Sequence, residues 1–186
     1  FNTAFNSIPG SQYNHALTSF PLIDTSGATD VNMMFYGQEA LTTLPLFNLS
    51  NVTNAEQFCR DCNGLTSLPA FDLSSCTSLW YAFFGCPSLT SFPAITLTNA
   101  CTTFNSAWAY CTGLTSFPVI NTSGGTNFSS TWRGVNHPSI GLSQLVTFPS
   151  LDFDSATAFN YCWAYSNALA NFPAGRFNST GALATN

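Results

Sequence analysis

A motif close to Leu-Thr-Ser-Phe-Pro recurs seven times along the chain, and this repeat constrains the fold more than any other feature. Its interval is 24 residues in four of the six steps, 25 in one and 31 in another. A fixed period of this length is typical of solenoids, in which each repeat is one coil stacked on the next. We therefore expect residues 1–186 to form a single solenoid domain of about seven coils. The coils begin at Leu17, Leu41, Leu65, Leu89, Leu114, Leu145 and Leu169.

Behind each leucine, residues of the same kind return at the same distances. Three residues on stands a phenylalanine or leucine, and a proline follows it in every coil: Phe20, Leu44, Leu68, Phe92, Phe117, Phe148 and Phe172. A later column holds large aromatic residues: Phe35, Phe83, Trp108, Trp132 and Trp163, with Cys59 in this place beside Phe58 in the second coil. One coil cannot bury its own apolar side, so equivalent residues must stack. We expect a phenylalanine spine in which Phe92 lies directly over Phe117.

The Leu-Thr-Ser-Phe stretch is the best strand candidate of each coil. It would pair in parallel with its copies at about 4.8 Å. Proline has no N–H for such a ladder, so a proline in every coil predicts strands of only three or four residues. On the other side of the coil, the Ala-Phe and Ala-Trp stretches predict turns or a short helical turn. The predicted fold class is thus a leucine-rich-repeat-like solenoid with one short parallel strand per coil.

The order of these columns resembles a known repeat family. Leu-x-x-Phe/Leu-Pro, then Ser-x-x-Thr, then Ala-Phe/Trp-x-x-Cys is similar to the BspA-like leucine-rich repeats and equally to the repeats of mycoplasma surface lipoproteins. The coil from Leu65 to Ser88 matches best, with Ala82, Phe83 and Cys86 in the family's places. Phe58-Cys59 departs from the pattern. The resemblance implies a non-catalytic display scaffold, as in bacterial surface adhesins and in tail-fibre-like proteins of marine phages.

Both ends of the sequence fall inside a coil. Phe1, Ala4, Phe5 and Ile8 match the second half of a repeat, and the last coil stops partway through. Terminal coils of a solenoid need polar caps, and neither end carries one. We therefore expect further repeats or other structural subunits at both ends.

The seven cysteines also follow the repeat. Cys62, Cys86 and Cys111 share one column, and Cys76 and Cys101 share another. Side chains in register would hold their Cβ atoms about 4.8 Å apart, beyond the roughly 3.5–4.5 Å of a disulfide. We expect free, buried thiols that act as small apolar side chains. Disulfides and a bound metal remain the alternatives.

Charge excludes several classes of partner. Only 6% of residues are charged, the net charge is −5, and the cations are Arg60, Arg133 and Arg176. Nucleic-acid phosphates and anionic membrane surfaces both require clustered basic residues, which this chain lacks. No apolar run reaches the length of a spanning helix, so we expect no membrane insertion.

No catalytic constellation is recognisable. His15 and His137 are far apart in the sequence and have no nucleophile partner. Asp152 and Asp154 could form a carboxylate pair, but we interpret such aspartates as turn residues that accept backbone N–H groups. We therefore expect no enzymatic activity, no cofactor and no metal.

Two insertions break the repeat before a leucine stretch, at Pro9–Ala16 and at Asn136–Gln144. They are either tolerated surface loops or a frame for the face between them. That face would carry uncharged hydroxyl groups, which suit sugars or the edge of another protein. Its columns are Thr18, Thr42, Thr66, Thr90 and Thr115 with Ser19, Thr43, Ser67, Ser91 and Ser116. The candidate ligand-binding residues are Tyr13, His15, His137 and Gln144 on the loops and Thr42, Thr66 and Thr90 on the face.

The sequence favours a non-enzymatic protein of a virion surface or cell exterior. The leading hypothesis is a phage fibre or appendage segment that displays a binding face for a host-surface glycan or protein. The alternatives are a bacterial cell-surface adhesin and a purely structural spacer or filament subunit.

Overall fold

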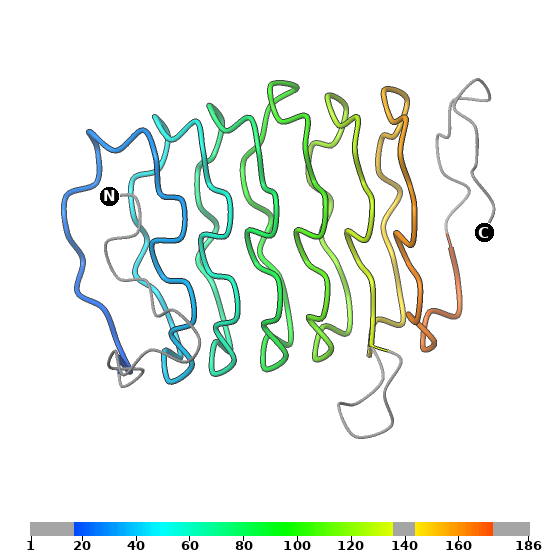
Figure 1. Ribbon diagram of the computed structural model, residues 1–186, viewed down its shortest axis with the longest axis horizontal. Helices are drawn as coiled ribbons and strands as arrows, with labels where there is room; N and C mark the ends of the chain where they lie inside the picture. Colours follow the sequence, from blue (N-terminus) through cyan, green and yellow to red (C-terminus); the bar gives the residue numbers. More distant parts are fainter. Residues whose placement is uncertain (1–16, 136–143, 173–186) are drawn as a thin grey trace.

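The computed structural model describes residues 17–135 and 144–172. Figure 1 shows the coils standing side by side in one row, in the order of the chain. We number them from their leucines: coil 1 (17–40), coil 2 (41–64), coil 3 (65–88), coil 4 (89–113), coil 5 (114–144), coil 6 (145–168) and the start of coil 7 at 169. Each coil therefore contacts mainly its two neighbours in the stack.

Parallel bridges join equivalent residues of successive coils. One row of bridges runs through six coils, linking Asp30, Asn54, Ser78, Thr103, Asn127 and Ala158. Each step advances by one sequence repeat, so the coils are stacked in register. This confirms the predicted repeat solenoid.

The predicted strands are not formed. Residues 17–135 and 144–172 contain no helix, and no strand extends beyond isolated bridges. In the Leu-Thr-Ser-Phe stretch, the amide after the leucine donates to the coil before it, as from Thr66 to the Thr42 carbonyl at 3.0 Å. The leucine amide itself bonds within its own coil, as from Leu65 to the Cys62 carbonyl at 3.1 Å. The leucine amide and the proline therefore add no bond between coils, which keeps this ladder short.

The densest backbone ladder lies in the second half of the coil. We call this part the turn segment; it comprises 31–37, 55–61, 79–85, 104–110, 128–134 and 159–165. In coil 3 the amides of Leu79, Tyr81, Phe83 and Gly85 donate to the next coil at 2.9–3.1 Å. The amide of Ala82, between them, donates to the Leu79 carbonyl at 3.0 Å. The segment is thus a run of turns. Of the two structures that the sequence predicts for this part of the coil, turns or a short helical turn, the first is the one formed.

Left-handed backbone makes this run of turns possible. Two positions of the turn segment have positive φ, at Tyr81 (56°) and Gly85 (70°) in coil 3. Most equivalents are not glycine: Met33, Gln57, Asp61, Ser106, Tyr110, Ser130, Tyr161 and Tyr165. A non-glycine residue there costs about 1–2 kcal/mol. The inter-coil hydrogen bonds and core packing of the segment offset that cost.

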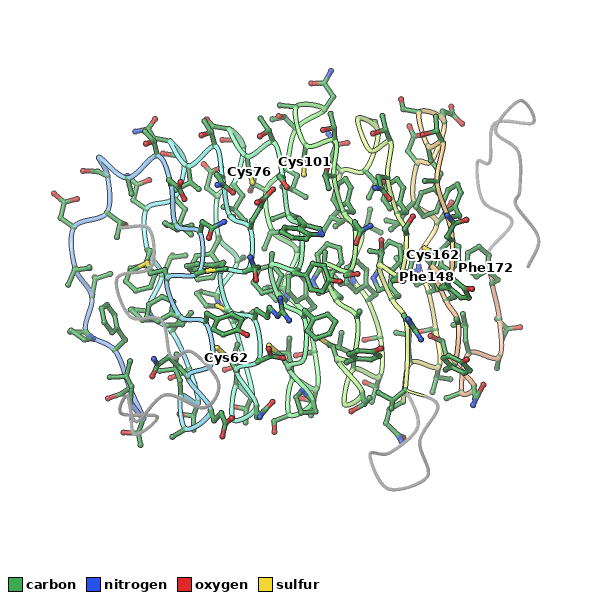
Figure 2. All side chains as sticks on the ribbon, in the orientation of Figure 1. Cys62, Cys76, Cys101, Phe148, Cys162 and Phe172 are labelled. Atoms are coloured by element: carbon green, nitrogen blue, oxygen red, sulfur yellow. The ribbon has the colours of Figure 1, made fainter. Side chains whose placement is uncertain are left out.

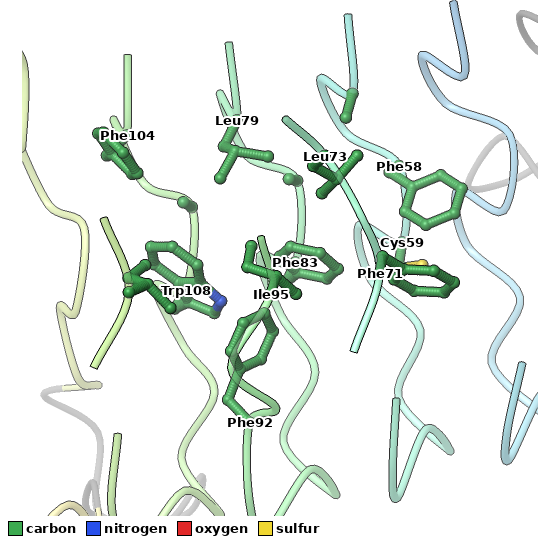
Figure 3. Packing of buried hydrophobic residues seen from close by; sticks show 14 of the residues in the cluster. Phe58, Cys59, Phe71, Leu73, Leu79, Phe83, Phe92, Ile95, Phe104 and Trp108 are labelled. Carbon is green, nitrogen blue, oxygen red and sulfur yellow. The ribbon is translucent and has the colours of Figure 1, made fainter. Parts of the chain in front are cut away.

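Aromatic columns fill the interior (Figure 3). The rings of Phe92 and Phe117 stack with centroids 5.6 Å apart and planes 7° from parallel. Trp108 and Trp132 stack at 5.7 Å and 8°. The two columns meet edge to face, as between Phe92 and Trp108 at 5.2 Å and 79°. The predicted phenylalanine spine is therefore confirmed, and it lies beside a second spine of tryptophans.

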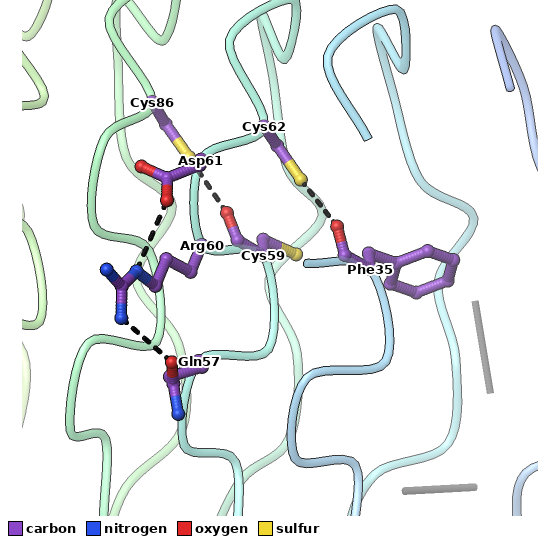
Figure 4. A network of polar contacts seen from close by, with 7 residues as sticks. All are labelled: Phe35, Gln57, Cys59, Arg60, Asp61, Cys62 and Cys86. Atoms are coloured by element: carbon purple, nitrogen blue, oxygen red, sulfur yellow. Dashed lines mark hydrogen bonds and ion pairs between the residues drawn. The ribbon is translucent and has the colours of Figure 1, made fainter. Parts of the chain in front are cut away.

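The cysteines are free and buried, as expected. Figure 4 shows what their column does. The thiol of Cys62 donates to the Phe35 carbonyl at 3.0 Å, and that of Cys86 to the Cys59 carbonyl at 3.2 Å. In coil 6 the Ser166 hydroxyl donates to the Trp132 carbonyl in the same way, at 2.9 Å. These side chains are buried hydrogen-bond donors as well as apolar filling.

Burial also favours the protonated form of the thiols of Cys59, Cys86 and Cys162. It raises the pKa of the Cys59 thiol and of the Cys162 thiol well above the ordinary value, because a thiolate is poorly solvated inside the stack. For Cys86 a hydrogen bond with Cys111 and burial together raise the pKa. Figure 2 labels Cys62, Cys76, Cys101 and Cys162, which lie in different coils of the stack.

Candidate binding faces

The hydroxyl columns predicted from the sequence are solvent-exposed. Thr42, Thr66 and Thr90 are all exposed, as are Thr43 and Ser67 in the neighbouring column. The Thr66 hydroxyl donates to the Thr42 carbonyl at 3.2 Å, and the Thr42 hydroxyl to the Thr18 carbonyl at 3.4 Å. Because their hydrogens are used inside the protein, these oxygens face solvent mainly as acceptors. Val146 takes the threonine place in coil 6 and interrupts the row.

Most of the predicted loop residues cannot be placed against this face. Tyr13, His15 and His137 lie outside the described residues, as does nearly all of both insertions. Gln144 is exposed, and its backbone N–H donates to the Thr112 carbonyl at 3.0 Å. It therefore lies where coil 5 joins coil 6, just before the leucine stretch.

A second threonine column is more regular than the first. It comprises Thr29, Thr53, Thr77, Thr102, Thr126 and Thr157, all of them exposed. The Thr53 amide and hydroxyl both donate to the Thr29 carbonyl, at 2.8 and 3.1 Å. The same double contact repeats up to Thr157 on Thr126, at 2.8 and 3.1 Å. The sequence pattern shows this column, but a threonine every 24 residues does not by itself say which way the side chain faces.

Asp152 closes a turn, as interpreted from the sequence, and Asp24 and Asp72 do the same at the equivalent place of their coils. One carboxylate oxygen of Asp24, Asp72 and Asp152 accepts the amide of Ser26, Ser74 and Asp154, respectively, at 2.9, 3.0 and 3.0 Å. The hydroxyl and amide of Ser26 lower the pKa of Asp24 because both bonds favour the ionised form. Asp152 also borders a shallow groove of about 330 Å³ between coils 5 and 6.

An aromatic and cationic face covers the outside of the turn segments, and sequence reasoning missed it. The Arg60 guanidinium lies over three rings, with its carbon 5.3 Å from the Tyr36 centroid, 4.9 Å from Tyr81 and 5.1 Å from Phe84. Its Nε donates to Asp61 at 3.2 Å and one terminal nitrogen to Gln57 at 2.9 Å (Figure 4).

Three coils further on, Arg133 is surrounded in a similar way. Its guanidinium carbon lies 5.8 Å from the Tyr110 centroid and 5.6 Å from both Tyr161 and Tyr165. The Tyr161 side chain is 59% exposed. Trp108, Trp132 and Arg133 line a small cavity of about 10 Å³. We call the outward residues of the turn segments the aromatic face: Tyr36, Arg60, Trp80, Tyr81, Phe84, Tyr110, Arg133, Tyr161 and Tyr165.

A signal for this face exists in the sequence. The turn segments read as core because of their Phe and Trp columns, but Tyr and Arg recur at the intervening places. Such residues are common in binding interfaces. The structure separates them into an inner and an outer row.

Within 17–135 and 144–172, no three His, Cys, Asp or Glu side chains gather closely enough to hold a metal ion. This part of the chain likewise holds no helix long and apolar enough to cross a bilayer.

Comparison with known proteins adds a fold likeness. No family model and no curated protein matches the chain. It is similar to the crystal structure of a leucine-rich repeat protein from Eubacterium ventriosum, with 18% sequence identity and a TM-score of 0.48. The likeness covers 80% of this chain and 37% of that one, so the chain spans little more than a third of its neighbour's length.

Proposed function

We propose that this chain is a non-enzymatic repeat protein of a virion or cell exterior, and specifically a phage fibre or appendage segment. In this proposal its stack displays a binding face for a host-surface glycan or protein. The observation that carries the proposal is the exposed, uncharged hydroxyl face around Thr42, Thr66 and Thr90. The resemblance of the repeat pattern to surface adhesins and tail-fibre-like proteins supports the location.

The chemistry of this face suits many weak hydrogen bonds. Successive threonines are one coil apart, roughly 5 Å, and the hydroxyl groups of Thr42 and Thr66 are each held by a bond to the coil before them. A face held this way is ordered before a ligand arrives, so little conformational entropy is lost on binding. It carries no charge, so it would bind without long-range electrostatic steering.

Glycan and cell-surface binding tests this proposal. The labelled chain would be applied to an array of surface glycans and to whole cells. A triple variant, Thr42→Val, Thr66→Val and Thr90→Val, removes three hydroxyl groups at nearly constant volume. We expect binding to fall at least about tenfold, since several hydrogen bonds of about 0.5–1.5 kcal/mol each are lost.

The second threonine column supplies a matched control. Thr53→Val, Thr77→Val and Thr102→Val remove hydroxyls that make the same contact with a preceding carbonyl. Any loss of stability should be similar, while binding should persist. Equal loss in both variants, or a wild-type chain that binds no glycan and no cell surface, would contradict the proposal.

A further inference from the structure

Arg60 and Arg133 occupy the same place in their coils. The Arg60 amide donates to the Gln57 carbonyl and the Arg133 amide to the Ser130 carbonyl, both at 3.2 Å. The residue after each arginine donates to the next coil, Asp61 at 2.7 Å and Gly134 at 2.8 Å. The backbone therefore aligns Asp61 with Gly134 and Gln57 with Ser130.

The two arginines differ in how their guanidinium groups are paired. Beside Arg60 the chain supplies the anion, because the Asp61 carboxylate lies 3.2 Å from the Arg60 Nε. At the aligned place beside Arg133 stands Gly134, which has no side chain. In the described part of the chain, the Arg133 guanidinium makes no hydrogen bond or ion pair, and its buried Nε lacks an acceptor.

Three tyrosine rings hold the unpaired cation in place. Tyr110 and Tyr165 occupy the column of Gly134 in the coils before and after it. The Tyr110 amide donates to the Arg133 carbonyl and the Gly134 amide to the Ala164 carbonyl, both at 2.8 Å. The guanidinium lies within 6 Å of both rings and of Tyr161. Rings at this distance attract a cation and fix its position without neutralising it. An ordered guanidinium with free N–H groups is suited to a carboxylate, which it can bind through two hydrogen bonds.

We propose that Arg133, Tyr110, Tyr161 and Tyr165 form a binding site for a sugar that carries a carboxylate group. The carboxylate pairs with the terminal nitrogens of Arg133, which has no internal anion such as Asp61, and the sugar ring lies against the exposed face of Tyr161. This inference rests on the proposed display function and names a ligand class and a second face for it. The net charge of −5 disfavours a polyanion, so the fitting ligand has an isolated carboxylate among neutral sugars.

Calorimetric titration with three probes tests the site. The probes are cellobiouronic acid, its methyl ester and sodium acetate, at low ionic strength. We expect the acid to bind at least about tenfold more tightly than the ester, because a charge-assisted hydrogen bond contributes about 1.5–3 kcal/mol. We expect acetate to bind more weakly than the acid, since it offers no ring to Tyr161. Equal binding of acid and ester overturns the inference, and acetate binding as tightly as the acid overturns the assignment to a sugar.

Four variants separate the site from the fold. Arg133→Gln should weaken acid binding at least about tenfold, while Arg60→Gln, the matched control, should leave it unchanged. Gly134→Asp should block the site by supplying an internal carboxylate with Arg133 still present. Asp61→Gly combined with Gln57→Ser should do the reverse, because this double variant removes both side-chain partners of Arg60 and raises the stoichiometry from one ligand to two. Glycine suits position 61, where φ is 58°.

The outcomes distinguish this inference from the proposed function. If Arg133→Gln binds the acid as well as the wild type, or the double variant Gln57→Ser, Asp61→Gly gains no second ligand, the inference is overturned. A chain that binds array glycans through the hydroxyl face but ignores the uronic acid overturns only the inference. A chain that binds the uronic acid but none of the surface glycans overturns only the assignment of the hydroxyl face.

Discussion

At the scale of single residues, coil 2 has its large and its small core side chain in the opposite order from the other coils. Other coils have a smaller or unbranched residue followed by a large ring, as in Ala82-Phe83, whereas coil 2 has Phe58-Cys59. Both are fully buried, and the Phe58 ring reaches the rings of Phe35 (5.6 Å) and Phe83 (6.4 Å). Phe58 thereby fills space that Cys59 leaves in the aromatic column.

This exchange predicts strong coupling between the two positions. Phe58→Ala should cost about 3–5 kcal/mol of unfolding free energy through the cavity it leaves. Cys59→Phe alone should cost about 1–3 kcal/mol by overpacking. The double variant, which restores the order of Ala82-Phe83, should be more stable than the sum of the two effects allows. Urea denaturation of all four proteins measures this, and additive losses would mean that the two side chains do not share space.

The thiol column predicts a role for the sulfur as a donor. Cys86→Ala leaves the buried Cys59 carbonyl without its thiol donor, whereas Cys86→Ser can keep the bond in the way Ser166 does in coil 6. We expect the serine variant to be about 1 kcal/mol more stable than the alanine variant. Thermal or urea unfolding provides the comparison. The reverse order would show that the thiol acts only as an apolar filler.

At the scale of the coil, glycine is required at Gly85, where a left-handed backbone coincides with a lack of room for a side chain. Gly85 has φ of 70°, and a Cβ there would run into the Asp61 carboxylate. Gly85→Ala should therefore cost about 1–2 kcal/mol. Gly27→Ala is the control, because a Cβ at Gly27 meets nothing within 4 Å and its φ is not positive. Unfolding experiments should find the control within about 0.5 kcal/mol of wild type, and equal effects would contradict the assigned backbone.

The coil also shows how far sequence could predict this structure. The columns, the Phe92–Phe117 stacking and the free thiols follow from periodicity, because in-register stacking leaves equivalent residues no other place. The absence of a strand does not follow from periodicity. It depends on the hydrogen bond of the leucine amide, which lies within its own coil. The left-handed positions are hidden because Tyr81 and Ser130 carry no glycine signal. The aromatic face is hidden because Phe83 and Phe84 are alike in sequence, yet only Phe84 faces outward, 4.8 Å from Tyr110.

At the scale of the whole molecule, the stack keeps all seven thiols away from solvent. All seven cysteines are buried and free. A reagent must reach the sulfur atom before it can react, and burial keeps these thiols out of its reach. We expect a thiol reagent such as dithionitrobenzoate to leave the native protein unmodified and to titrate seven thiols after denaturation. Fast reaction of any thiol in the native state would place that cysteine at the surface.

The central claim is that equivalent residues of successive coils lie directly over one another, and distances along one column test it most directly. Single cysteines at the exposed positions Thr29, Thr53, Thr126 and Thr157 accept spin labels, since the native cysteines are buried. Pulsed electron paramagnetic resonance should give about 20 Å for Thr29–Thr126 and for Thr53–Thr157, which are four coil steps each. It should give about 25 Å for Thr29–Thr157, five steps apart. Distances that do not grow with the number of coils between the labels would contradict the stacked solenoid.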